Sequence, residues 1–142
     1  MLFVIALEEG KIPGIDQNVL ECFPDKQFEN MDDNKKAMTL KHLLTMTAGI
    51  EWAHGTKDDP TQDLFYAKDP VRFVLDRPMA HKPGEAFMYN NGATQVLGQY
   101  IESVTGKTLS GYADEKLLAP PGIKDYFWQK ISSAGRLRIC RA

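Results

Sequence analysis

A tyrosine and an asparagine two positions apart, Tyr89 and Asn91, are the side chains whose types and spacing best suit chemistry in this chain. They stand just before a predicted helix, where a phenol and an amide can reach the same space. The phenol can pass a proton, and the amide can orient a carbonyl or an ammonium group. A structural role is the alternative, with Tyr89 as a packed loop aromatic and Asn91 as the N-cap of the helix. Taken alone, the three-residue pattern favours the structural role.

The serines of the chain do not provide a nucleophile with its own base. Serine catalysis needs a neighbouring group that takes the hydroxyl proton, and no serine here stands in a GxSxG or an SxxK pattern. Two fall in predicted helices and two in the C-terminal tail, so we interpret all four as structural. They are Ser103, Ser110, Ser132 and Ser133.

A phosphate loop and a metal site are also disfavoured. Gly106-Lys107-Thr108 has the ending of a phosphate loop, but Ile101 stands where the first glycine of that loop belongs. We expect Gly106 to end a helix instead. The histidines and cysteines show no spacing typical of metal ligands, and each histidine is interpreted as a surface or core residue. The sequence therefore predicts no metal and no cofactor. The residues concerned are His42, His54, His81, Cys22 and Cys140.

The elements that would position Tyr89 and Asn91 are predicted to be mostly helices. A helix already in progress at Met1 ends near Glu9, before a turn over 10–14. Residues 15–36 are predicted to form an irregular surface excursion, of which 29–36 is a solvated loop.

The helix predicted after Tyr89 has the clearest pattern in the chain. Its apolar residues between 93 and 104 recur at the spacing of one helical face, and Gly106 follows as a cap. Shorter helices are predicted after Thr39, after Asp69-Pro70 and over 108–118. No strand of convincing length is predicted.

Three stretches, in matching order, resemble the β-lactamase-related serine hydrolases, a group that includes class C β-lactamases, penicillin-binding carboxypeptidases and related esterases. They are 39–52 (TLKHLLTMTAGIEW), 73–95 with its PGEAFMYNNGATQ ending, and 105–123. The resemblance covers roughly residues 1 to 128. The LDRPM stretch at 75–79 is most similar to the branch of esterases and 6-aminohexanoate-oligomer hydrolases.

The resemblance implies roles for both residues of the pair. In this family the serine of an SxxK motif forms the acyl-enzyme, the tyrosine of a YxN motif joins the proton relay, and its asparagine steadies substrate and lysine. Tyr89 would be the relay phenol and Asn91 the orienting amide. The SxxK motif would fall about eight residues before Met1, roughly 12 Å further back on an extension of the helix that opens the chain. That backward extension is expected to point toward a cleft that the phenol of Tyr89 faces. A third motif, KTG or HxG, would follow residue 142.

Three features depart from the family pattern. The chain holds no SxxK, so we expect no covalent catalysis from it alone. Pro121 stands where the family usually has leucine. The tail over 129–142 does not resemble the glycine-rich segment expected there. A truncated or frameshifted reading frame would explain both ends.

These observations predict a mainly α fragment of an α/β β-lactamase/transpeptidase-like fold, with one partial domain over 1–128 and an atypical tail over 129–142. The predicted function by resemblance is hydrolysis of a small-molecule ester or amide through an acyl-enzyme, with this chain inactive by itself. The alternative is a small helical binding module without chemistry. A severed piece would also leave apolar helix faces uncovered and be marginally stable.

Composition narrows the partners. Seventeen basic and nineteen acidic side chains give a net charge of -2, which offers no general attraction to nucleic acid. The apolar run over 1–7 is too short to span a membrane and is wrongly flanked for a signal peptide. The compartment and the oligomeric state are left open by these features.

Overall fold

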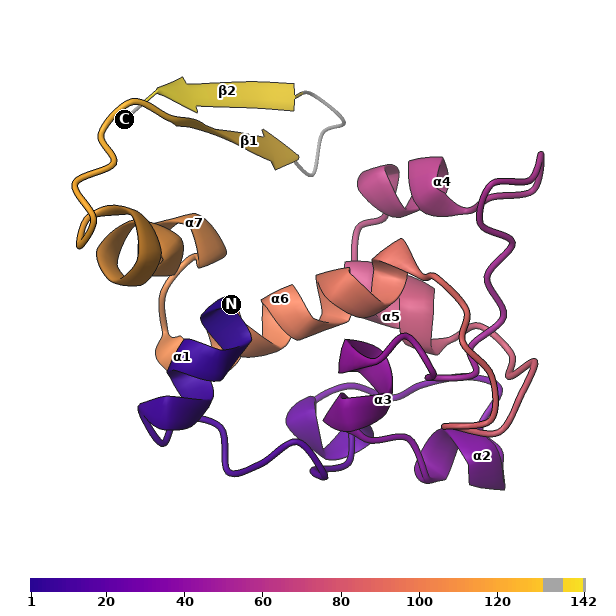
Figure 1. The fold of residues 1–142 in the computed structure, drawn as a ribbon. Helices are drawn as coiled ribbons and strands as arrows, with labels where there is room; N and C mark the ends of the chain where they lie inside the picture. Colours follow the sequence, from indigo (N-terminus) through magenta and orange to yellow (C-terminus); the bar gives the residue numbers. More distant parts are fainter. Residues whose placement is uncertain (132–136, 142) are drawn as a thin grey trace.

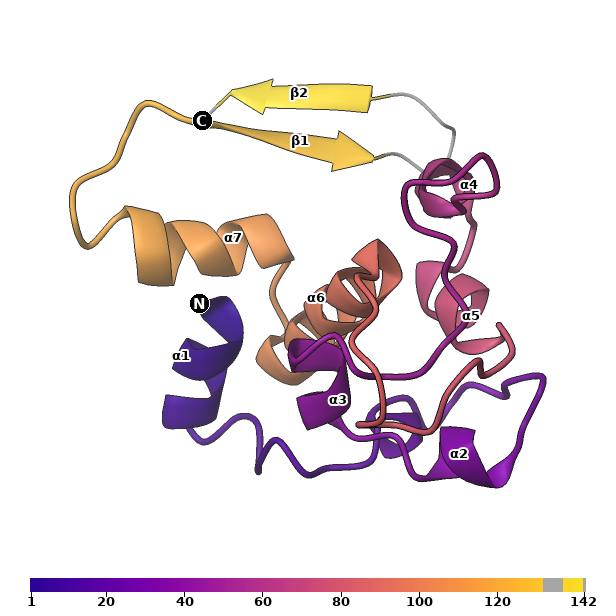
Figure 2. The same ribbon diagram turned by 45° about the vertical axis from the view of Figure 1, so that its right-hand side comes forward.

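The long helix that follows Tyr89 forms the centre of the molecule. A computed structural model describes the backbone of residues 1–131 and 137–141 and the side chains of residues 1–127. In it, α6 (Asn91–Thr105) is flanked by α1 (Leu2–Glu8), α3 (Leu40–Leu44) and α5 (Pro70–Leu75), as Figures 1 and 2 show. The remaining helical segments are η1 (Leu20–Cys22), α2 (Asp33–Lys36), α4 (Thr61–Tyr66), α7 (Leu109–Ala113) and the π-helical turn η2 (Asp114–Leu118).

Helix α6 forms where its apolar periodicity predicts it. Its first turn is capped by Asn90, whose Oδ1 accepts a hydrogen bond from the backbone N–H of Ala93 at 3.1 Å. Gly106 ends it in the left-handed conformation, with φ +67° and its N–H bonded to the carbonyl of Glu102 at 2.9 Å. The prediction that Gly106 is a helix cap and not part of a phosphate loop is confirmed. The inward face of the helix is formed by Ala93, Val96, Leu97, Tyr100 and Ile101.

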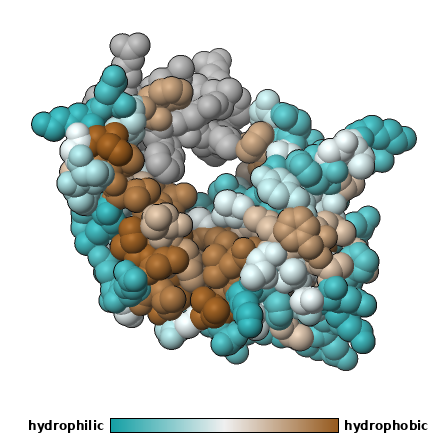
Figure 3. Space-filling model, viewed as in Figure 1, coloured by the Kyte–Doolittle hydropathy of each residue, from teal (hydrophilic) through white to brown (hydrophobic). Residues whose placement is uncertain are grey.

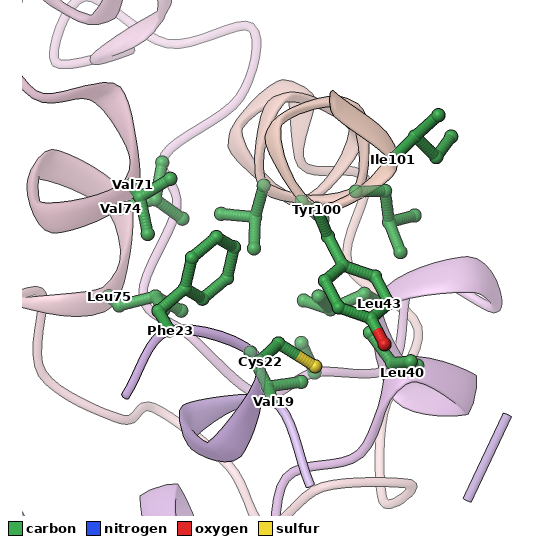
Figure 4. Close-up of a cluster of buried hydrophobic side chains, with 14 of the residues drawn as sticks. Val19, Cys22, Phe23, Leu40, Leu43, Val71, Val74, Leu75, Tyr100 and Ile101 are labelled. Atoms are coloured by element: carbon green, nitrogen blue, oxygen red, sulfur yellow. The ribbon is translucent and has the colours of Figure 1, made fainter. Parts of the chain in front are cut away.

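The core joins α6 to segments far away in the sequence. Figure 4 shows side chains of η1, α3 and α5 meeting the same face of α6. Each such aliphatic side chain, when fully buried, contributes about 1.5–3 kcal/mol to stability. This cluster fixes the position of α6 and of the loop before it. Its labelled members are Val19, Cys22, Phe23, Leu40, Leu43, Val71, Val74, Leu75, Tyr100 and Ile101.

The predictions for the first helices divide into confirmed and wrong ones. A helix does run from the start of the chain to Glu8, and α5 begins after Asp69 as expected. The prediction of a solvated loop over 29–36 is correct for the exposed residues 29–32 and wrong for α2, in which Lys35 is fully buried. Its ammonium donates to the carbonyl oxygens of Glu29 (2.9 Å) and Arg77 (2.8 Å). These two bonds offset the cost of burying the charge, and burial lowers the pKa of Lys35.

The prediction that the chain contains no convincing strand is also wrong. Strand β1 (Phe127–Ile131) pairs antiparallel with β2 (Leu137–Arg141), with Phe127 opposite Arg141. A strand is stabilised by backbone bonds to its neighbour, so segments this short leave little periodic signal in the sequence. Part of the predicted atypical tail thus lies in a hairpin, and its residues 132–136 and 142 lie outside the described residues.

An apolar surface lies around α1 on the face seen in Figure 3, where hydrophobic residues gather over the start of the chain. Met1 is 80% exposed and Val4 is 49% exposed. This agrees with the expectation that helices of this chain leave apolar side chains uncovered. Among the helices that the structure describes, none has both the length and the apolar character to cross a membrane.

Candidate functional site

The structure separates the two roles that the sequence left open for Asn91. The N-cap of α6 is Asn90, which is 3% exposed, and Asn91 is the first residue of the helix. The alternative prediction that Asn91 caps this helix is therefore wrong. Since Asn90 satisfies the first turn, the amide of Asn91 is free to bond elsewhere.

The side chain of Asn91 bonds to the start of α4. Its Nδ2 donates to Oγ1 of Thr61 at 3.2 Å. Helix α4 was not predicted from the sequence, although Asp59-Pro60 repeats the Asp-Pro signal that correctly predicted α5. That repeated signal could have indicated a helix start at Thr61.

Tyr89 is not sealed in the core. It is 46% exposed, and the centroid of its ring lies 4.6 Å from that of His54, with the two planes tilted by 52°. The described residues offer no hydrogen-bond partner to its hydroxyl. The phenol oxygen is therefore available to a group from outside the described part of the chain.

His54 is the residue at this site that sequence reasoning missed. It was interpreted as an ordinary surface or core histidine, but its Nδ1 lies 3.1 Å from Oδ2 of Asp59 while its ring contacts Tyr89. No spacing rule connects residues 54 and 89, because the contact is made between two loops. Only the folded structure brings them together.

Asp59 is the most connected side chain of this region. Its Oδ2 accepts from the backbone N–H of Gly55 at 2.8 Å, and its Oδ1 accepts from the backbone N–H of Thr61 at 2.9 Å. The hydroxyl of Thr61 also donates to Oδ1 at 2.5 Å. Together with the charge of His54, these bonds lower the pKa of Asp59 to about 2, the hydroxyl bond from Thr61 having the largest effect.

The ionised state of Asp59 decides the direction of the neighbouring hydrogen bonds. A carboxylate only accepts, so the hydroxyl of Thr61 must donate to it and accept from Nδ2 of Asn91. The Oδ1 oxygen of Asn91 then remains available as an acceptor for a ligand.

Gly92 allows α6 to begin against the core at this point. A Cβ at position 92 would lie 2.6 Å from Cγ2 of Val74 and 2.8 Å from Cη2 of Trp52. Trp52 is 3% exposed and lies under the guanidinium of Arg77, whose Cζ is 5.5 Å from the indole centroid. Close approach to this rigid platform sets the position of Asn91.

The other candidate groups lie elsewhere or bond within the fold. The hydroxyl of Ser103 donates to the carbonyl of Tyr100 at 2.8 Å, and that of Ser110 lies 3.4 Å from Oγ1 of Thr108. These contacts agree with structural roles for both serines, while residues 132 and 133 lie outside the described side chains. Within residues 1–127, no group of histidine, cysteine and acidic side chains could hold a metal ion. A surface depression lined by residues between 114 and 126 includes neither Tyr89 nor Asn91.

The resemblance also predicts that α1, extended backward, points toward the cleft that Tyr89 faces. Figures 1 and 2 both show its amino end directed toward the side of α6 on which α7 and the hairpin lie. Tyr89 precedes the amino end of α6, where Asn91 bonds to the start of α4. Whether a backward extension of α1 reaches the phenol stays a prediction.

Comparison with known proteins identifies the family. A family model described as Beta-lactamase matches residues 1–136. The chain belongs to this family. The predicted resemblance to β-lactamase-related serine hydrolases is thereby confirmed. The match continues past residue 128, where the sequence predicted a domain boundary, and that boundary itself stays a prediction.

The relatives of this chain are much longer proteins. It is 31% identical over 113 residues to Protein flp of Staphylococcus aureus strain MRSA252, a match covering 80% of this chain and 22% of flp. It is 25% identical over 122 residues to Esterase EstB of Burkholderia gladioli, covering 78% of this chain and 31% of EstB. The chain therefore spans between about a fifth and a third of these curated relatives.

Solved structures support the fold. The octameric penicillin-binding protein homologue from Pyrococcus abyssi superposes with a TM-score of 0.64 at 23% identity, covering 99% of this chain and 36% of that chain. The mostly helical structure described above therefore has the fold of part of a penicillin-binding protein homologue. The full α/β architecture, with a sheet closing the site, remains an expectation for a longer protein.

Proposed function

We propose that this chain provides the Tyr89 and Asn91 side of a serine-hydrolase site that cleaves a small-molecule ester or amide through an acyl-enzyme. The observation that carries the proposal is that the two asparagines at the start of α6 have different roles. Asn90 caps the helix, and this leaves the amide of Asn91 and the half-exposed phenol of Tyr89 available at one end of the same helix. Similarity to Esterase EstB supports an ester as one substrate class.

The proposed role of Tyr89 is proton transfer. In acylation, a serine oxygen forms a bond to the carbonyl carbon of the substrate, and its proton passes through the basic relay to the leaving oxygen or nitrogen as that bond breaks. Water then attacks the ester of the acyl-enzyme, and the proton it loses returns to the serine. A phenol open to solvent and without a fixed acceptor in the described residues suits such a relay.

The proposed role of Asn91 is orientation. One hydrogen of its Nδ2 is directed to Thr61, so its Oδ1 faces away from that bond. An amide oxygen in this position can accept from an ammonium group or from an N–H of the substrate. The bond to Thr61 limits the rotation of the amide and so lowers the entropy lost when a ligand binds.

This chain is proposed to be inactive by itself, because it has no SxxK serine and lysine. The test is to incubate the purified chain with a chromogenic ester and with a chromogenic β-lactam. We expect no release of product above the buffer rate. Saturable hydrolysis that survives repurification would show that the chain has a nucleophile of its own.

The role of Tyr89 is tested in a protein that contains an SxxK motif. The DNA before the Met1 codon is read first, and where it encodes an SxxK motif in frame, about eight codons upstream, the longer protein is expressed. In the protein expressed from that longer frame, Tyr89→Phe should lower kcat about 100-fold, as removal of an acid–base group does. Tyr66→Phe is the matched control, since Tyr66 is 67% exposed on α4. An unchanged kcat in Tyr89→Phe would remove Tyr89 from the relay.

A helical binding module without chemistry is the second candidate. It is favoured by the continuity of the core, which runs from α1 through α3 and α5 to Tyr112 of α7. Thermal unfolding of the purified chain separates the two. A sharp, reversible transition of a monomer would favour the module, whereas a broad transition or aggregation is expected of a chain with an incomplete core.

A further inference from the structure

We infer that Asp59 is a positioning residue that holds both Tyr89 and Asn91 in place through two arms of one short loop. The importance of this arrangement for catalysis rests on the proposed function, but the arrangement itself does not. We name residues 54–61, which contain every contact of Asp59 given above, the clamp loop. Tyr89 and Asn91 are the two ends that it holds.

The first arm runs from Asp59 to Tyr89 through His54. Nδ1 of His54 lies 3.1 Å from Oδ2 of Asp59, a contact that restrains the imidazole and is an ion pair when the imidazole is protonated. That imidazole contacts the phenol ring of Tyr89, with 4.6 Å between the centroids. Rings at this separation attract each other and restrict each other's rotation. The orientation of an exposed phenol is therefore set without burying its hydroxyl.

The second arm runs from Asp59 to Asn91 through Thr61. The hydroxyl of Thr61 donates to Asp59 at 2.5 Å and accepts from Nδ2 of Asn91 at 3.2 Å. Because a hydroxyl has a single hydrogen, the carboxylate decides how that hydroxyl points. It thereby decides which end of the Asn91 amide faces Thr61.

A carboxylate is required at the centre of the clamp loop. Both of its oxygens accept from a backbone N–H, one from Gly55 and the other from Thr61. An amide in the same place would have to turn its NH₂ group toward one of these donors in either orientation. Asp59→Asn, although equal in size, is therefore expected to release both arms.

The positions of Tyr89 and Asn91 thus depend on the side chain of Asp59, which contacts neither of them directly. Asp58, its neighbour, is exposed, and its carboxylate has no hydrogen bond or ion pair to the described side chains. The two adjacent aspartates therefore differ in their contacts. Asp58→Asn is consequently a close control for Asp59→Asn.

The test uses the purified chain as it is and follows two NMR reporters. The ring signals of Tyr89 report the first arm, and the side-chain NH₂ signals of Asn91 report the second. Asp59→Asn should shift both sets of signals. His54→Ala should shift those of Tyr89 alone, and Thr61→Val those of Asn91 alone. Asp58→Asn should shift neither, and Thr61→Ser, which keeps the hydroxyl, should retain the Asn91 signals of the parent chain.

Two results would overturn the inference. One is that Asp59→Asn leaves both reporters at their parent positions in a folded protein. The other, which applies even if Asp59→Asn does not fold, is that Thr61→Val and Thr61→Ser give the same Asn91 signals. Neither result depends on turnover. Loss of the clamp is thus distinguished from failure of the proposed function, which the kinetic test of Tyr89→Phe addresses.

Discussion

The regions at the two ends of α6 hold tyrosines in opposite environments. Before its amino end, Tyr89 is half exposed and is contacted on its ring by His54. Toward its carboxyl end, Tyr100 and Tyr112 are buried, and their hydroxyls donate to Gln17 (2.6 Å) and Glu9 (3.0 Å). The same side chain is therefore used in two ways on a single scaffold.

The two environments differ in how well a tyrosine within them could take part in a proton relay. Burial raises the pKa of Tyr100 to about 12 and also raises that of Tyr112. A buried phenol with a fixed acceptor keeps its proton and contributes packing. A phenol whose oxygen is open to a substrate can exchange its proton. Among Tyr89, Tyr100 and Tyr112, only Tyr89 therefore suits a role in proton transfer.

The largest expected effect is on stability, at the carboxyl end of α6, where the tyrosines are buried. Tyr112→Ala removes a fully buried aromatic ring and its bond to Glu9, so we expect the free energy of unfolding to fall by about 3–5 kcal/mol. Denaturant unfolding measures the change. Tyr66→Ala, at a position 67% exposed, is the control and should change it by less than about 0.5 kcal/mol. Equal losses of stability in Tyr112→Ala and Tyr66→Ala would contradict the difference expected between a buried and an exposed tyrosine.

A smaller loss is expected where α6 starts. Gly92→Ala places a Cβ 2.6 Å from Val74 and 2.8 Å from Trp52, and overpacking of this kind costs about 1–3 kcal/mol. Its effect should also reach the NH₂ signals of Asn91, which is the preceding residue. Gly14→Ala is the control, since no atom lies within 4 Å of a Cβ at that position. If Gly92→Ala left the free energy of unfolding unchanged, the indole of Trp52 would have moved aside at little cost.

Acid titration should distinguish the two ends by their carboxylates. The pKa of Glu9 is lowered to about 2, mainly by its hydrogen bond from Lys116, and that of Asp59 to about 2, mainly by Thr61. Because both values are lowered in the folded state, each group contributes stability above its ordinary pKa, 4.5 for Glu9 and 3.8 for Asp59. That contribution is lost as the pH falls through about 2.

The variants for this titration are chosen to act on one end each. Thr61→Val should raise the pKa of Asp59 toward its ordinary value and leave that of Glu9 unchanged. Lys116→Gln should do the reverse. Carboxyl carbon shifts recorded against pH measure both groups in one sample. A parallel rise of both values in either variant would show that the two ends are coupled.

The smallest expected effect on stability comes from removing the hydroxyl groups of Tyr100 and Tyr89. Tyr100→Phe deletes a bond to Gln17 and should cost about 1 kcal/mol. Tyr89→Phe deletes a hydroxyl without a partner in the described residues, so it should change stability by less than about 0.5 kcal/mol. Urea unfolding of the two variants side by side is the measurement. A larger loss in Tyr89→Phe would reveal that its hydroxyl has a structural role.

Several elements could be predicted because their signals are local. The apolar spacing of α6, its ending at Gly106 and the Asp69-Pro70 start of α5 each depend on residues within a few positions of one another. The family was recognised for a similar reason, since its motifs are short and stand in matching order. Tyr89 and Asn91 were chosen on that basis, and their catalytic roles stay predictions.

Other features could not be predicted because they depend on distant partners. Lys35 is buried because a carbonyl from residue 77 reaches its ammonium, and the strands of the hairpin form by pairing with each other. Either residue 90 or residue 91 could have capped α6 from the sequence, since both are asparagine. The position of Trp52 against Gly92 favours the register in which Asn90 is the cap.

The sequence by itself determined the family and five helices, α1, α3, α5, α6 and α7, because backbone propensity, capping and short motifs act over a few residues. Tertiary structure decided which asparagine is free, why a histidine contacts Tyr89, and how Asp59 connects to both members of the pair. These depend on contacts between segments some thirty positions apart, as in the bond between Asn91 at the start of α6 and Thr61 at the start of α4. Only the packing of α4, α5 and α6 on a common core brings such segments within the reach of a hydrogen bond.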